Sequence, residues 1–160
     1  MSTPPPTPGR PTVEDVALLL RARTKDSGGN EVGTFDDDTR PTADAVEEQI
    51  DAAMALVGVR FPTPDKMTAE AQAAFACLVA YRAALRIEKS YWPEQVRSDR
   101  SPYELLWTEY QDDLAALEAA IEAGGATGAE VVSAGYGSLP VGSWTLVGPY
   151  CPPIPEETTP

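Results

Sequence analysis

Apolar residues recur at helical spacing in four segments of the chain, and polar or proline-rich stretches separate these segments. The segments cover about residues 13–23, 43–57, 69–90 and 102–123. The internal prolines fall between the segments and never in the interior of one: Pro41, Pro62, Pro64, Pro93 and Pro102. Because proline breaks the interior of a helix, this punctuation predicts four helices.

Each predicted helix carries an apolar stripe for a core to bury. The first three stripes are Val13, Val16, Ala17 and Leu20; Val46, Ile50, Ala53 or Met54, and Val57; and Phe75, Leu78, Val79 and Leu85. The fourth alternates steps of four and three, as a heptad seam does: Tyr103, Trp107, Tyr110, Leu114, Leu117 and Ile121. We therefore predict an all-α fold, a small four-helix bundle.

Hydroxyl residues mark the predicted starts of the helices, because their oxygens accept hydrogen bonds from the first free backbone N–H groups. The expected N-caps are Thr12, Thr42, Thr68 and Ser101. Pro102 would then occupy the first helical position, which proline tolerates. Gly124 and Gly125 are expected to end the last helix.

Residues 126–160 have a different character, with the β-prone pieces "EVVS" and "SWTLV" on either side of the glycine-rich "AGYGSLPVG". This stretch carries large apolar residues that a purely disordered tail rarely has: Tyr136, Leu139, Trp144, Leu146, Val147 and Tyr150. We interpret them as the partner or oligomer contacts of an extended arm that orders on binding. The alternative is that the arm packs back on its own bundle. The predicted organisation is a Pro-rich N-terminal extension (1–11), a helical bundle (12–124) and a C-terminal arm (125–160).

The charge of the chain narrows the function classes. Of 160 residues, 25 are acidic, 12 are basic and none is histidine, which gives a net charge of −13. This balance disfavours a protein that grips nucleic acid, because such binding depends on Lys and Arg. After Arg100 the chain has nine acids and no base, so the last helix and the arm present an anionic surface.

Two cysteines, Cys77 and Cys151, lie far apart and form no CxxC motif, so we expect unpaired thiols in a reducing cytoplasm. The chain shows no signal peptide and no apolar run long enough to span a membrane, so no membrane partner is expected.

Three consecutive acids, Asp36, Asp37 and Asp38, are the first candidate for a metal site and hence for a metal-dependent hydrolase. Adjacent side chains of an extended stretch point in alternating directions, and the spacing of a calcium loop is absent. We therefore interpret them as an acidic turn before the Thr42 cap, with Arg40 as a local counter-charge, and expect no metal and no cofactor.

Arg82, Arg86 and Lys89 lie four and three residues apart on one predicted helix face. They are either a phosphate-tracking stripe or, as we favour, partners for acids of the last helix, within or between subunits. Those acids include Asp112, Asp113 and Glu118.

No motif for catalysis is present: there is no glycine-rich phosphate loop, no Gly-x-Ser-x-Gly elbow and no histidine to act as a base. The protein is not expected to be an enzyme. A helix-turn-helix nucleic-acid-binding protein of a packaging machinery is a further alternative. Its second helix would need basic residues, whereas the segment 43–57 has acids and no base.

Four strings together make the chain resemble the head-to-tail adaptor (connector) proteins of long-tailed phages of actinobacteria. They are "PTVEDVALLLRARTKD", "GNEVGTFDDDTRPTADAVEEQIDAA", "IEKSYWPEQ" and "SPYELLWTEY". In order and spacing they cover about residues 11–123, whereas the N-terminal stretch and the arm are at most loosely similar.

The resemblance implies a structural virion protein with a small helical fold, found at the capsid–tail junction and in the host cytoplasm during assembly. A ring of about twelve copies would lie beneath the portal, extend the DNA channel and receive the next connector or tail protein. An acidic channel surface would let the genome pass without specific binding, because it repels phosphate. The Asp36–Asp38 loop or the polar face of the last helix would line the channel.

Overall fold

The computed structural model describes residues 9–94, 96 and 102–124, and this part of the chain is all-α, with no named strand. Its elements are α1 (Val13–Leu19), the 3₁₀ helix η1 (Arg21–Arg23), α2 (Ala43–Gly58), the 3₁₀ helix η2 (Pro64–Lys66), α3 (Ala69–Tyr91) and α4 (Tyr103–Glu122). The predicted four helices are therefore present. The first is shorter than expected, because the chain tightens into η1 after Leu20.

Threonine side chains begin three of the helices, as the sequence predicts. Thr12 accepts a hydrogen bond from the backbone of Asp15, whose carboxylate accepts one from Thr12 in return, so the two form a capping box. The hydroxyls of Thr42 and Thr68 accept hydrogen bonds from the backbone N–H groups of Ala45 and Ala71, and so cap α2 and α3 without a reciprocal bond. The predicted start of α4 is wrong by one residue: Pro102 occupies the N-cap position itself and offers no side-chain bond.

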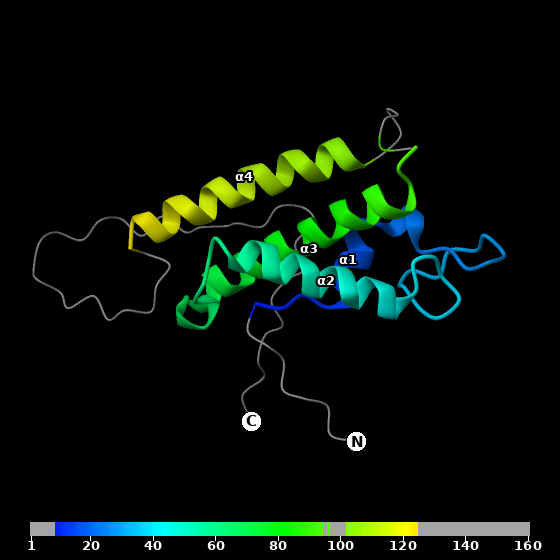
Figure 1. Cartoon of the computed structure of the whole chain (residues 1–160), viewed down its shortest axis with the longest axis horizontal. Coiled ribbons are helices and arrows are strands. Elements are labelled where there is room, and N and C mark those ends of the chain that lie inside the picture. Colours follow the sequence, from blue (N-terminus) through cyan, green and yellow to red (C-terminus); the bar gives the residue numbers. More distant parts are fainter. Residues whose placement is uncertain (1–8, 95, 97–101, 125–160) are drawn as a thin grey trace, which may run out of the picture.

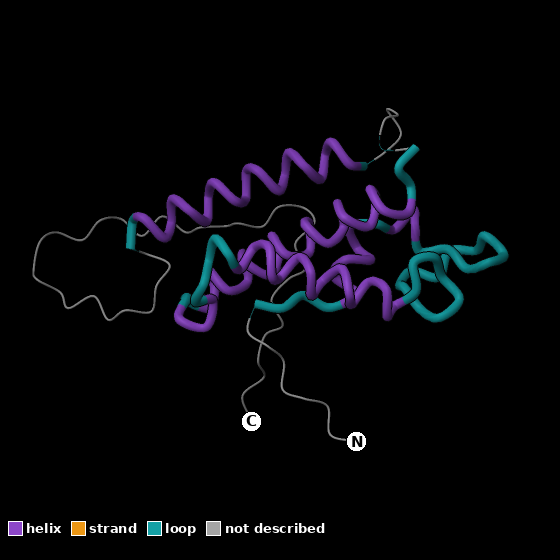
Figure 2. Tube along the Cα trace, viewed as in Figure 1, coloured by secondary structure: helices purple, strands orange, loops and turns teal. Residues whose placement is uncertain are grey.

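α3 is the central helix. α2 and α4 each pack along it, on different sides, and α1 lies against both α3 and α2 (Figure 1). α4 makes its extensive contact with α3 alone, so the helices form a three-helix unit with a fourth helix added on one flank (Figure 2). Much of the α4 surface is consequently left uncovered by the described residues.

The core lies where α3 meets its neighbours, and the predicted stripes of α1, α2 and α3 are buried in it. Phe61 and Phe75 meet there edge to face, with ring centroids 6.1 Å apart. The α4 seam is only partly as predicted. Leu106, which the heptad pattern omitted, is buried, whereas Trp107 remains 40% exposed.

Gly9 and Arg10, near the end of the Pro-rich extension, pack against the helices. Arg10 forms ion pairs with Glu47 and Asp51 of α2, the latter at 2.8 Å, and these contacts raise its pKa, the hydrogen bond from Arg10 to Glu47 most of all. Gly9 has a φ of 72° and lies so close to Phe75 that a Cβ atom would come within 2.8 Å of the ring. A side chain at position 9 would thus meet both backbone strain and a clash.

Candidate functional site

The acidic stretch 36–38 forms a turn that Asp36 organises. One carboxylate oxygen of Asp36 accepts hydrogen bonds from the backbone N–H groups of Asp38, at 2.9 Å, and Thr39, at 3.0 Å. The Thr39 hydroxyl in turn accepts from the Asp36 N–H at 2.9 Å. The Asp36 carbonyl then accepts from Ala43 N–H at 3.2 Å, which links the turn to the first residue of α2. This is the predicted turn before the Thr42 cap, and its Arg40–Pro41 peptide bond is cis.

The turn does not gather a metal-binding set of side chains. Asp36 is committed to backbone N–H groups, while Asp37 and Asp38 are exposed. Within residues 9–94, 96 and 102–124, no three Cys, His, Asp or Glu side chains lie close enough together to hold a metal ion. The geometry thus favours a structural role for this stretch.

The three cations of α3 diverge instead of forming one stripe. The Arg82 guanidinium lies 5.7 Å from the ring centroid of Tyr110 on α4. Arg86 donates a 3.0 Å hydrogen bond to Gln49 on α2, and Lys89 is exposed. In the described part of the chain, none of the three forms an ion pair with an acid of α4. Pairing between subunits stays a prediction.

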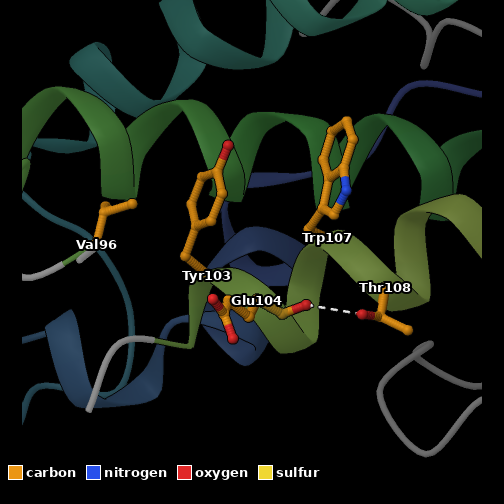
Figure 3. Close-up of a pocket in the computed structure, with 5 residues that line it drawn as sticks. All are labelled: Val96, Tyr103, Glu104, Trp107 and Thr108. Atoms are coloured by element: carbon orange, nitrogen blue, oxygen red, sulfur yellow. Dashed lines mark hydrogen bonds between the residues drawn. The ribbon is translucent and has the colours of Figure 1, made fainter. Parts of the chain in front are cut away.

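A shallow groove along the start of α4 is lined by Val96, Tyr103, Glu104, Trp107 and Thr108, and we call it the aromatic groove. Tyr103 and Trp107 project from the helix in the same direction, one turn apart (Figure 3). The Thr108 hydroxyl donates a 3.0 Å hydrogen bond to the Glu104 carbonyl, within the helix. The Trp107 ring also stacks on Tyr110, with centroids 5.8 Å apart and planes inclined by 29°. The groove therefore presents the rings of Tyr103 and Trp107, and the stacking contact with Tyr110 stabilises the position of the Trp107 ring.

The acidic side chains of α4 include a group that repel one another. Six acids and no base occur between Tyr103 and Glu122. Asp113 is half-buried, and burial, followed by the charges of Glu109 and Asp112, raises its pKa. Glu118 differs from these, because it pairs with Arg60 at 2.7 Å across partly exposed surface.

The sequence reasoning missed a buried ion pair between η1 and α3. Arg23 binds Glu88 through two hydrogen bonds, Nε to Oε1 at 2.7 Å and Nη2 to Oε2 at 2.9 Å. Glu88 is fully buried and the Arg23 side chain is 15% exposed. The guanidinium also lies 4.4 Å from the ring centroid of Trp92. The one signal in the sequence was a glutamate on the apolar face of the third helix.

The arm residues Tyr136, Leu139, Trp144, Leu146, Val147 and Tyr150 lie outside the described residues.

Cys77, on α3, is disulfide-bonded, so the expectation of an unpaired thiol is wrong at this position. No helix in the described ranges combines the length and apolar character that crossing a membrane requires.

Nothing matched the chain in comparisons with protein-family models, curated proteins and solved structures.

Proposed function

We propose that the protein is a structural head-to-tail adaptor, which forms a ring under the portal of a long-tailed phage and joins the capsid to the tail. The sequence resemblance suggests this class. The observation that carries the proposal further is α4, whose extensive contacts are with α3 alone and whose charged side chains are all acidic.

An uncovered acidic helix suits a channel that DNA must traverse. Duplex phosphates are repelled by clustered carboxylates, so the genome can slide past without binding. Glu109, Asp112 and Asp113 form such a cluster, and their mutual repulsion contributes to the raised pKa of Asp113. We therefore assign the channel-facing surface to α4 in preference to the turn at 36–38. In that turn the Asp36 carboxylate accepts hydrogen bonds from backbone N–H groups.

Contacts between proteins would use the apolar residues that remain on the outside. Leu56 and Val59 lie one turn apart at the end of α2, and Leu105 lies on α4; all three are exposed. Leu56 and Val59 lie close together, and exposed apolar residues in such proximity commonly mark protein interfaces. In an assembled ring they would contact neighbouring copies, the portal or the downstream connector.

Particles assembled without this protein provide the test. The proposal predicts DNA-filled heads and free tails in place of joined virions, seen by electron microscopy, and restoration by the wild-type chain. Normal tailed particles in its absence would contradict it.

Charge reversal separates the two candidate channel surfaces. Glu109→Lys with Asp112→Lys should slow genome release from assembled virions, whereas Asp37→Lys with Asp38→Lys should leave it near normal. Equal release by both variants would refute the assignment of α4 to the channel.

A further inference from the structure

A disulfide joins α3 to the C-terminal arm. Cys77, in the first half of α3, is disulfide-bonded, and the sequence has one other cysteine, Cys151. Within the chain the bond therefore links Cys77 to Cys151. α4 ends on the side of the fold where α3 begins (Figure 1). The arm thus leaves the bundle after Gly124 and is attached to it again at Cys77, so it is a closed loop and not a free arm.

The bond confines the residues that precede Cys151. The two Cα atoms of a disulfide lie about 4.4–6.8 Å apart, and an extended chain advances about 3.6 Å per residue. Tyr150 must therefore lie within about 11 Å of the Cys77 Cα atom, and Val147 within about 21 Å. For comparison, the 23 residues of α3 span about 34 Å. The surface of their own bundle is consequently always within reach of both side chains.

The face of α3 that carries Cys77 is apolar and partly open. Ala73 lies four residues before Cys77 and Ala74 three, so these side chains share one face of the helix. All three are partly exposed, although α1, α2 and α4 each pack on α3. The described helices thus leave a surface of small side chains on this face, and burying apolar residues against it is favourable.

The stretch just before Cys151 has the composition to cover this surface. Residues 144–150 read "WTLVGPY" and carry no charge, whereas residues 152–160 contain two acids and one large aliphatic residue, Ile154. We propose that residues 144–150, which we call the strap, pack on this face of α3 in their own chain and are held there by the disulfide. The strap then completes the fold of its own chain, and contacts between copies are made by exposed residues such as Leu56 and Val59.

Limited proteolysis of the purified, oxidised full chain tests the strap. Chymotrypsin cleaves after aromatic residues and leucine, so Trp144, Leu146 and Tyr150 report on its accessibility. Dithiothreitol opens the disulfide by thiol exchange: two electrons and two protons pass to Cys77 and Cys151, and the reagent becomes a cyclic disulfide. Cleavage within 144–150 should be at least tenfold slower in the oxidised chain than in the reduced chain. Cys77→Ser combined with Cys151→Ser should behave as the reduced chain does.

Variants that keep the disulfide separate packing from tethering. Ala73→Glu places a charge against the uncharged strap, so it should speed cleavage of the oxidised chain at least fivefold. Ala55→Glu, on the exposed side of α2, is the matched control and should stay within twofold of wild type. Trp144→Ala leaves α3 unaltered and should speed cleavage after Tyr150 at least fivefold. Leu139→Ala, an apolar change in the arm outside the strap, should not.

A non-reducing peptide map of mixed light and heavy-isotope chains should show the Cys77–Cys151 bond within one chain. A bond between two copies would overturn the proposal, and so would equal cleavage of the oxidised and reduced chains. Unchanged cleavage in both Ala73→Glu and Trp144→Ala would also overturn it, because the segment would then be tethered without packing. The experiment uses the isolated chain and no portal, so its failure leaves the adaptor proposal untouched.

Discussion

Removing the Arg23 guanidinium should destabilise the protein more than any other single loss of charge in the described part of the chain. Glu88 is fully buried, and Arg23 supplies two of its hydrogen bonds, at 2.7 and 2.9 Å. Breaking a buried ion pair from one side costs about 3–5 kcal/mol, because the remaining charge keeps its desolvation penalty. For Arg23→Met we therefore expect a loss of about 4 kcal/mol in the free energy of unfolding. The contact with Trp92 adds about 1 kcal/mol.

Urea unfolding followed by circular dichroism measures the change, and a double-mutant cycle isolates the pair. Arg23→Met with Glu88→Met should be less destabilised than the sum of the two single variants, because neither ion then remains buried. Arg21→Met, two residues away and exposed, is the matched control and should stay within about 0.5 kcal/mol of wild type. A loss below about 1 kcal/mol for Arg23→Met, or additive single effects, would refute the reasoning.

Three further predictions concern stability. Asp113→Asn should stabilise the fold by about 0.5 kcal/mol at pH 7, because the raised pKa of Asp113 means that its charged form is disfavoured when folded. That gain should shrink as the pH falls through the raised pKa and should vanish below the unfolded value; a gain that persists at pH 2.5 would contradict it. Asp36→Ala should lower the free energy of unfolding by about 1 kcal/mol, because the Asp36 carboxylate accepts two backbone hydrogen bonds, whereas Asp37→Ala should change it very little. Adding Mg²⁺ or EDTA should leave the melting temperature of the wild type unchanged. A large metal-dependent shift in that temperature would indicate a metal site. Phe75→Leu should cost about 1–2 kcal/mol in urea unfolding through the lost edge-to-face contact and a small cavity, and a neutral effect would show that the site repacks.

The helices could be predicted because their signals are local. A threonine cap acts on a backbone group three residues away, so Thr12, Thr42 and Thr68 identify their helices without any knowledge of the fold. The acidic turn at 36–38 is local in the same sense, because Asp36 binds N–H groups two and three residues along the chain.

Features that depend on which helices meet were harder to predict. Arg23 and Glu88 are 65 residues apart, and only the folded chain brings them together. The four-residue spacing of Arg82 and Arg86 predicts that they lie on one helix face. In the structure Arg82 contacts α4 and Arg86 contacts α2, because α3 lies between these two helices. Trp107 fits a heptad seam, but α4 has one packed flank, so burial centres on Leu106 and Tyr110 and leaves the indole partly exposed.

Native mass spectrometry of the full-length protein, mixed with the portal ring encoded by the same genome, tests the adaptor proposal most directly. The proposal predicts a complex with one copy of this chain per portal subunit. An intact portal ring that binds no copy would contradict it.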